Sequence, residues 1–179
     1  TKWDNAVRAM DNLRKANLLD ATALNRAERS MVEECVRPAG FYRQKARAVQ
    51  EVGSVLVSRF GASTDRLFHL SYDELRRELL TWRGVGPETA DAIMLYAGGR
   101  AAFVVDAYTQ RLQRRFGAVV MNGDPTYAQT AAAWARASGG RVETFKALHG
   151  AIVDHCKTVC TAVPDCPRCA LSSRCAKRL

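Results

Sequence analysis

The residues most suited to chemistry lie near the end of this 179-residue chain, and they are Cys160, Cys166, Cys169 and Cys175. Four thiolates so close together can bind one metal centre. The spacings of five, two and five residues lack the loop of roughly fifteen to twenty residues that separates the cysteine pairs of a zinc ribbon. The pattern therefore favours an iron–sulfur cluster over a zinc ion. A disulfide framework is a further alternative, but such domains spread their cysteines along the chain, whereas all but Cys35 lie near its end here.

The choice of the fourth ligand depends on helical phase. Cys156 continues a stripe of apolar residues at helical spacing that includes Leu148 and Ile152, so we expect its thiol to pack in the core. Cys160 lies beyond that stripe and is the better ligand. Cys35 shares one face of a predicted helix with apolar neighbours and is also expected in the core.

A second feature is Gly84-Val85-Gly86, which lies between two predicted helices with Pro87 at the first position of the second. This is the pattern of a helix-hairpin-helix. Glycines allow a tight turn with exposed backbone N–H groups, and such groups can bind a DNA phosphate without reading the base sequence. A Gly-x-Gly turn alone is weakly specific, but between two amphipathic helices of a basic chain it predicts a DNA-binding turn.

The third feature is a carboxylate at the end of an apolar run. Phe103, Val104 and Val105 lead directly to Asp106, which stands at the start of a helix predicted over residues 107–116. Taken alone, this aspartate is explained as a helix N-cap.

The elements that must position these residues are helices, because apolar residues recur at the helical period along most of the chain. Ser71 and Glu74 predict a capping box, and Asp124-Pro125 predicts the N-cap and first position of another helix. Only residues 101–105 are candidates for an extended segment. The sequence therefore predicts an all-α fold.

The composition points to a polyanion as partner. Lys and Arg number 27 against 18 Asp and Glu, which makes the formal net charge +9 and the sequence pI about 9.6. No apolar stretch reaches the roughly 20 residues of a membrane span, and no signal peptide precedes Thr1. We expect a cytoplasmic, nucleoid-associated protein that does not bind membranes, and an intact protein that is longer at its N-terminus.

In their order along the chain, the hairpin, Asp106 and the terminal cysteines resemble the endonuclease III family of helix-hairpin-helix (HhH-GPD) DNA glycosylases. The resemblance covers nearly the whole chain. It implies a six-helix barrel domain over residues 1–116, with the helix-hairpin-helix at about 73–97. It also implies a small helical iron–sulfur domain over 117–179, completed by N-terminal residues outside this sequence. The family's cofactor is a [4Fe-4S] cluster, and Asp106 matches its catalytic aspartate.

The chain departs from the family pattern in three ways. Glu88 stands where lyase members have a lysine, and a carboxylate cannot form a Schiff base. Five residues instead of six separate the first two cysteines, which bears on Cys160 as a ligand. The segment that supplies a polar residue near the flipped base would precede Thr1.

Glu88 determines which activity we expect. It predicts a monofunctional glycosylase, in which this carboxylate lines the base pocket or only interacts favourably with the dipole of its helix. One alternative is a bifunctional glycosylase and AP lyase that uses another lysine, such as Lys146 or Lys157. A second alternative is a DNA-binding paralogue with weak catalysis.

Further DNA contacts are predicted beside the hairpin. Gly40-Phe41-Tyr42 resembles the family's Gly-Leu-Tyr loop, so Phe41 is a candidate for the wedge that replaces a flipped base; the alternative is a core or staple aromatic. Basic side chains that would bind phosphates, or would only form solvated faces, are Arg43, Lys45, Arg111, Arg114 and Arg115.

These features together predict a monomeric DNA repair glycosylase acting on double-stranded DNA with a damaged or mispaired base. Such an enzyme flips the nucleotide out and hydrolyses its N-glycosidic bond, while Asp106 stabilises the positive charge that develops on the deoxyribose. Family members act on oxidised pyrimidines, mispaired bases or alkylated purines, and lysine-free relatives favour the last two.

Overall fold

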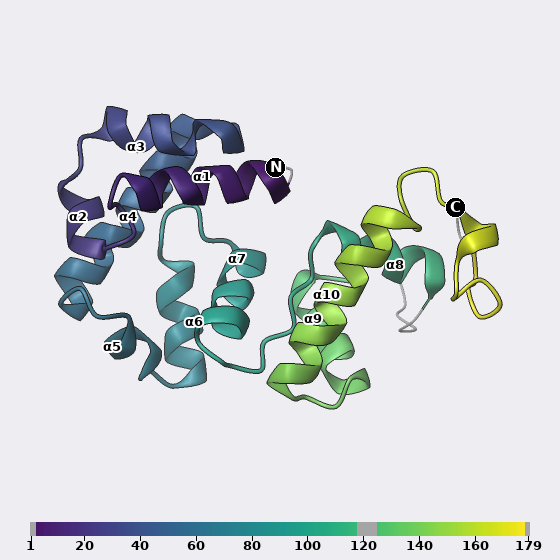
Figure 1. The fold of residues 1–179 in the computed structure, drawn as a ribbon. Helices are drawn as coiled ribbons and strands as arrows, with labels where there is room; N and C mark the ends of the chain where they lie inside the picture. Colours follow the sequence, from purple (N-terminus) through teal and green to yellow (C-terminus); the bar gives the residue numbers. More distant parts are fainter. Residues whose placement is uncertain (1–2, 118–124, 178–179) are drawn as a thin grey trace. The chain divides into compact units, whose positions relative to one another are not determined.

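The structure, a computed structural model, describes residues 3–117 and 125–177 (Figure 1). Its regular elements within these ranges are all helical, which confirms the predicted all-α fold. The α-helices are α1 (Trp3–Lys15), α2 (Ala21–Arg26), α3 (Arg29–Val36), α4 (Tyr42–Phe60), α5 (Thr64–Phe68), α6 (Tyr72–Leu80), α7 (Pro87–Ala92), α8 (Ala107–Phe116), α9 (Tyr127–Ala137) and α10 (Val142–Thr158). Two 3₁₀-helices, η1 (Arg37–Ala39) and η3 (Cys166–Arg168), and a π-helical turn, η2 (Ile93–Ala97), complete the described elements. None of the described helices is long and apolar enough to cross a membrane.

The chain divides into two compact units, Thr1–Gly86 and Pro87–Leu179. The division falls in the hairpin between α6 and α7. The boundary predicted after residue 116 lies inside the second unit, where α8 packs against α10 around one core. A separate iron–sulfur domain over 117–179 stays a prediction.

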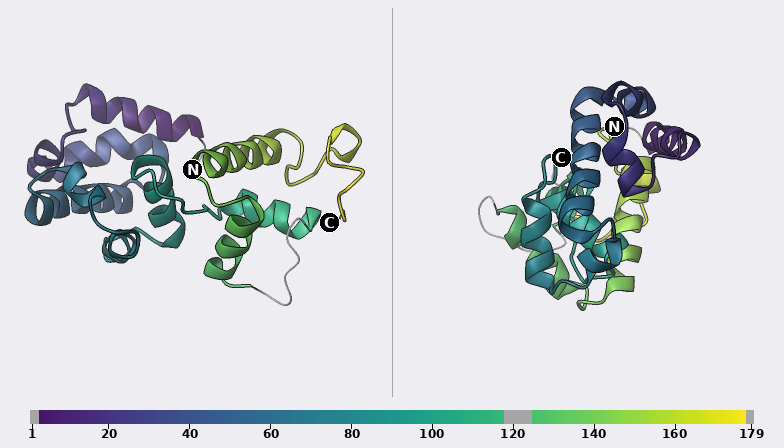
Figure 2. Two further views of the ribbon diagram at one scale, coloured as in Figure 1. Left: turned by 90° about the horizontal axis from the view of Figure 1, so that it is seen from below. Right: turned by 90° about the vertical axis from the view of Figure 1, so that its left-hand side faces the viewer.

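The first unit is built around α4. This helix contacts α2, α3 and α5, and α1 packs against α3 (Figure 2). The residues buried together in this core are Leu13, Leu18, Leu24, Val32, Val36 and Ala46, with Cys35 and Tyr42 partly buried against them. Cys35 is therefore a core residue, as its helical phase predicts.

Most helices begin where local sequence predicts. Ser71 and Glu74 form the predicted capping box at α6, and Asp106 caps α8. The predicted start at Asp124-Pro125 is wrong for Pro125, because α9 begins two residues later, after Thr126; Asp124 lies outside the described residues. Thr126 and Gln129 form a reciprocal capping box, which satisfies two free N–H groups where a single cap would satisfy one.

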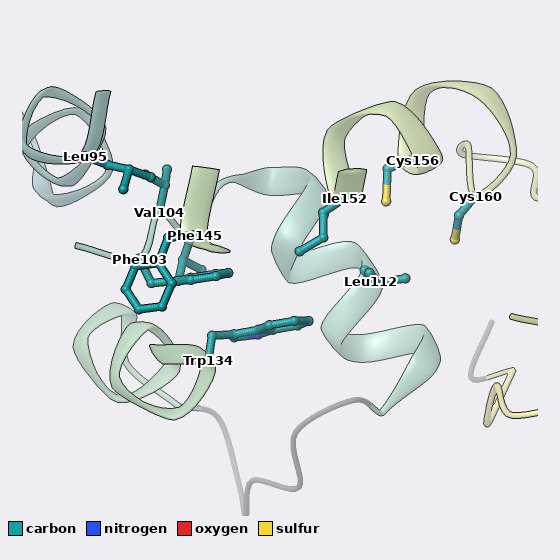
Figure 3. Packing of buried hydrophobic residues seen from close by; sticks show 10 residues of the cluster. Leu95, Phe103, Val104, Leu112, Trp134, Phe145, Ile152, Cys156 and Cys160 are labelled. Atoms are coloured by element: carbon teal, nitrogen blue, oxygen red, sulfur yellow. The ribbon is translucent and has the colours of Figure 1, made fainter. Parts of the chain in front are cut away.

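The core of the second unit forms around the extended segment before α8 (Figure 3). Residues 102–105 are all buried, and the Phe103 ring lies 5.5 Å from the Trp134 ring of α9 and 5.3 Å from the Phe145 ring of α10. Cys156 lies in the same core with 1% of its surface exposed, which confirms that it is a packed thiol. Because the extended segment is held on several sides, the position at which Asp106 leaves the core is fixed.

Candidate functional site

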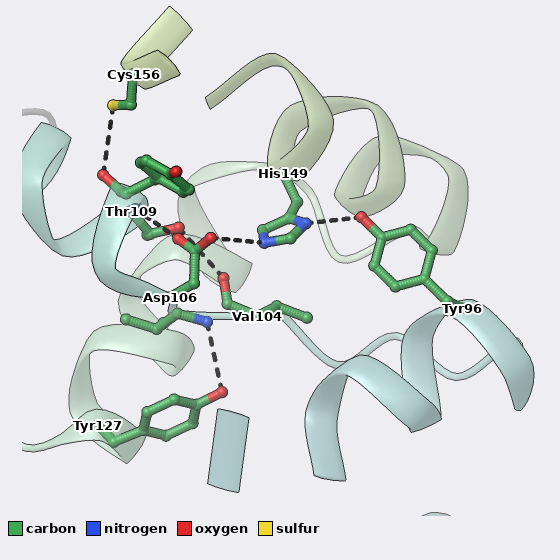
Figure 4. Close-up of polar contacts among 9 residues, drawn as sticks. Tyr96, Val104, Asp106, Thr109, Tyr127, His149 and Cys156 are labelled. Carbon is green, nitrogen blue, oxygen red and sulfur yellow. Dashed lines mark hydrogen bonds and ion pairs between the residues drawn. The ribbon is translucent and has the colours of Figure 1, made fainter. Parts of the chain in front are cut away.

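Asp106 lies at the junction of the buried extended segment and α8 (Figure 4). Its Oδ1 accepts a hydrogen bond of 2.7 Å from the Thr109 amide, the usual contact of an N-cap. Its Oδ2 lies 3.5 Å from Nε2 of His149, at the outer limit of a hydrogen bond. The Asp106 side chain is 15% exposed, so the carboxylate is shielded while part of its surface stays accessible.

His149 connects Asp106 to a third side chain. Its Nδ1 lies 2.7 Å from the hydroxyl of Tyr96, and its buried Nε2 has no closer partner among the described residues than Asp106. Tyr96 lies on the π-helical turn η2 and His149 on α10, so three separate elements form this chain of contacts.

Neither Tyr96 nor His149 was singled out from the sequence. The scarcity of histidine, with three in the chain, offers a weak signal. The π-helical turn is a second indicator because such turns often mark functional sites, but the sequence does not reveal it.

The polar contacts of Asp106 determine its charge. Burial by itself would raise the pKa of this carboxyl, but hydrogen bonds from His149 and Thr109 outweigh burial and hold the pKa below its ordinary value. Asp106 is therefore ionised at neutral pH.

Glu88, in the first turn of α7, has the opposite shift. Burial raises its pKa, the negative charge of Asp106 raises it further, and His149 opposes both effects. The structure thus brings the predicted pocket residue Glu88 into the electrostatic range of Asp106. Two carboxyl groups whose pKa values move apart are typical of sites in which one group stays ionised and the other can hold a proton.

The predicted DNA-binding turn follows α6. Gly84 has φ of +80°, and a Cβ there would lie 2.9 Å from the Cβ of Ala48 on α4, so the turn requires glycine at this position. Trp82 anchors the start of the turn, because its ring is buried and its Nε1 donates to the Glu78 carboxylate at 2.9 Å. Gly86 has no positive φ, and no described atom lies within 4 Å of where its Cβ would be. The fold does not require glycine at Gly86, which leaves this part of the turn open.

Phe41 projects from the loop before α4. Its surface is 81% exposed, so the interpretation as a core or staple aromatic is wrong. Its φ of 46° lies in the left-handed region, which is unusual for a bulky residue and costs conformational energy. Lys45, a predicted phosphate ligand, donates from Nζ to the carbonyl of Ala39 and so braces this loop from within.

The two residues after Phe41 differ in their surroundings. Tyr42 is partly buried, and the Arg37 guanidinium lies 4.6 Å from the centre of its ring. Arg43 is exposed, 5.7 Å from the same ring. Of the two, Arg43 is the side chain more open to solvent.

The four predicted cluster ligands, Cys160, Cys166, Cys169 and Cys175, line one cavity after α10. No group of three His, Cys, Asp or Glu side chains in residues 3–117 and 125–177 is spaced to hold a single metal ion. A four-iron cluster takes four thiolates, so its ligands need only surround a common space, which these four do. N–H donors also approach two of the sulfurs: Arg115 Nη1 lies 3.5 Å from Cys160 Sγ, and the Lys177 amide lies 3.4 Å from Cys175 Sγ. The donor set fits a cluster.

Two of the predicted phosphate ligands on α8 have a different role. Arg111 donates to the carbonyls of Cys156 and Cys160 at 3.3 Å, and Arg115 donates to those of Cys160 and Thr161. These guanidiniums hold the segment that enters the cysteine cavity. Phosphate binding by Arg111 and Arg115 stays a prediction, and the sequence did not indicate these contacts because the partners lie more than forty residues away.

Comparisons with known proteins identify relatives of this chain. A model of the HhH-GPD superfamily of base excision DNA repair proteins matches residues 1–137. The chain is 36% identical over 180 residues to MJ1434 of Methanocaldococcus jannaschii, provisionally named a DNA repair glycosylase, with 99% of this chain and 80% of that protein covered. It is 26% identical to the chloroplastic endonuclease III homolog 2 of Arabidopsis thaliana, with 93% of this chain but only 42% of that protein covered.

Solved structures show the same fold. A non-covalent endonuclease III–DNA complex superimposes with a TM-score of 0.77 at 23% identity, covering 95% of this chain and 74% of that one. The 3-methyladenine DNA glycosylase MagIII of H. pylori, bound to 1,N6-ethenoadenine, superimposes with a TM-score of 0.73 at 24% identity, covering 88% of this chain and 79% of that one. From the matched residues and the close relative, we conclude that the chain belongs to the HhH-GPD superfamily of base excision DNA repair proteins, as an endonuclease III-like DNA glycosylase.

Proposed function

We propose that this protein is a monofunctional DNA glycosylase that flips a damaged or mispaired base out of double-stranded DNA and hydrolyses its N-glycosidic bond. The observation that carries the proposal is Asp106, a shielded carboxylate whose pKa is held low by His149 and Thr109. Breaking the bond develops positive charge on the deoxyribose, and a preorganised anion stabilises that charge more in the transition state than in the ground state. Asp106 also supplies an acceptor that can orient the attacking water.

His149 and Tyr96 position that carboxylate. Nδ1 of His149 lies 2.7 Å from the Tyr96 hydroxyl, and Nε2 of the same ring faces Asp106 at 3.5 Å. The contact with His149 helps to hold the pKa of Asp106 below its ordinary value, so the carboxylate stays ionised. The negative charge remains available to the sugar.

Glu88 supports hydrolysis without strand cleavage. It occupies the position of the lyase lysine, and a carboxylate cannot attack the sugar to form a Schiff base. Burial and the negative charge of Asp106 raise the pKa of Glu88, whereas the pKa of Asp106 is held low, so Glu88 takes up a proton at higher pH than Asp106 does. Glu88 would thus line the base pocket.

The first unit would bind the DNA backbone and supply the side chain that replaces the flipped base. The backbone N–H groups of Gly84 and Gly86 are candidates for holding one DNA phosphate, whereas the Val85 N–H donates to the Trp82 carbonyl at 3.1 Å and closes the turn. The open space at Gly86 supports this role. Phe41 is exposed and held in a strained conformation, which suits a side chain that enters the base stack.

We also propose that Cys160, Cys166, Cys169 and Cys175 hold a [4Fe-4S] cluster. The support is the single cavity that the four thiols line, together with the family resemblance. When bound, the cluster would tie together the loops after α10. Arg111 and Arg115 already hold one end of that segment from α8.

A bifunctional glycosylase and AP lyase is the second candidate. Lys146 lies one turn before His149 on α10, on the same face of that helix. Its Nζ is 3.4 Å from Glu143, an exposed pairing that a substrate can displace.

The test is a panel of duplexes that each carry one damaged or mispaired base, scored for free base and for strand breaks. We expect free base and an intact abasic strand from at least one duplex. Borohydride trapping on abasic DNA separates the two candidates, since a strong covalent adduct that disappears in Lys146→Gln would establish the lyase. Release of no base from any duplex would refute the glycosylase.

A further inference from the structure

A basic hollow in the first unit has no role in the function proposed above. Arg29 at the start of α3, Arg47 and Glu51 on α4, and Arg83 in the hairpin turn line a hollow of about 370 Å³. The hollow is open to solvent, so an anion can reach it without moving a side chain.

The charges in this hollow are unbalanced. Three guanidiniums face one carboxylate, so the net charge is +2. None of these four side chains has a hydrogen bond or ion pair to another residue of the part of the chain that the structure describes. Other exposed arginines of this unit do have such partners, as in Arg14 with Asp11 at 2.5 Å and Arg37 with Glu34 at 2.6 Å. Gathering unpaired cations in one place is unfavourable unless an anion joins them.

The hollow adjoins the hairpin turn. Arg83 directly precedes Gly84, and Gly84 approaches Ala48, the residue that follows Arg47 on α4. The close contact between Gly84 and Ala48 therefore holds Arg83 and Arg47 next to each other. Guanidinium groups suit phosphate because they donate two parallel hydrogen bonds to its oxygens.

We propose that the hollow of Arg29, Arg47 and Arg83 binds a second backbone phosphate of the DNA, next to the one expected at the hairpin turn. Glu51 weakens this contact, because its carboxylate repels the phosphate. The inference rests on the proposed function only in taking DNA as the partner.

The test is the salt dependence of binding to a fluorescent duplex with a stable abasic-site analogue. The logarithm of the affinity falls with the logarithm of salt concentration by about 0.9 for each phosphate contacted. We expect the double variant Arg47→Gln/Arg83→Gln to reduce this slope by about 1 and the affinity at about 50 mM salt by roughly tenfold. Glu51→Gln should raise the affinity.

Arg14→Gln is the control for the loss of a surface guanidinium as such, because this guanidinium is already paired with Asp11. Thermal unfolding of each variant checks that the fold is kept. A double variant that binds like Arg14→Gln, with the same slope, would overturn the proposal, as would unchanged or weaker binding by Glu51→Gln. These results are distinct from failure of the glycosylase, which the release of free base measures.

Discussion

Removal of the His149 imidazole should slow base release, because the Asp106 carboxylate loses a contact that orients it and lowers its pKa. The carboxylate accepts a hydrogen bond from the Thr109 amide at 2.7 Å, and His149 Nε2 lies 3.5 Å from it, longer than a well-formed hydrogen bond. A hydrogen bond to a charged group contributes about 1.5 to 3 kcal/mol, and the long distance to His149 places this contact at the lower end. A loss of about 1.5 kcal/mol in the transition state corresponds to roughly tenfold in rate, which we expect for His149→Leu.

The pH dependence should change in a predictable direction. His149 lowers the pKa of Asp106 because it stabilises the ionised form. Without the imidazole this pKa rises, so the protonated and inactive carboxyl persists to higher pH. The acid limb of the rate profile in His149→Leu should therefore move to higher pH, whereas a purely structural loss would lower the rate at every pH equally.

The assay is single-turnover release of free base over a range of pH, with affinity for abasic-site DNA measured in parallel. His149→Gln keeps an N–H group that can reach Asp106 and should recover part of the rate. Tyr96→Phe removes only the hydrogen bond between the Tyr96 hydroxyl and Nδ1 of His149, so it should lower the rate less than His149→Leu does. His69→Gln, on a hydrogen bond to the Asp65 carbonyl in the first unit, is the control. The reasoning is refuted if His149→Leu keeps both the rate and the acid limb of the unmodified protein.

Four further predictions concern other residues. Asp106→Asn should lower base release by orders of magnitude with equal or higher DNA affinity, and unchanged release would reject its catalytic role. Gly84→Ala should lower the free energy of unfolding by about 1 to 2 kcal/mol, because the residue has a positive φ and its Cβ would meet Ala48 of α4. Gly86→Ala should weaken DNA binding and change the free energy of unfolding by no more than about 0.5 kcal/mol. Phe41→Ala should slow the release of free base from duplex DNA but not from single-stranded DNA. The melting temperature should not fall, because the ring is exposed. An equal effect on both substrates would exclude a wedge. Cys160→Ser should lose iron and visible iron–sulfur absorption, and a variant that keeps both would remove this residue from the ligand set.

Some predictions held because their causes lie within a few residues. The capping box of Ser71 and Glu74 and the N-cap contact of Asp106 with Thr109 each span three residues, so the sequence contains both partners. The buried phase of Cys156 follows from helical period in the same way. The catalytic role of Asp106 stays a prediction, and it rests on the resemblance to a family, because the residue by itself is explained as an ordinary N-cap.

Other features could not be predicted because the partners lie far apart in sequence. Arg111 and Arg115 bind backbone carbonyls of the segment after α10, which no pattern around either arginine indicates. Phe41 allowed two interpretations until its exposure was known, because an aromatic residue after glycine occurs both in cores and in exposed loops.

The sequence by itself determined the helical class, the local caps, the basic charge and the group of cysteines, because periodicity, capping and spacing are properties of neighbouring residues. Only the tertiary structure decided that His149 and Tyr96, separated by 53 positions, meet beside Asp106. It also decided that three arginines of α3, α4 and the hairpin share one hollow. Such contacts depend on how helices pack around a core, and no local pattern records that packing.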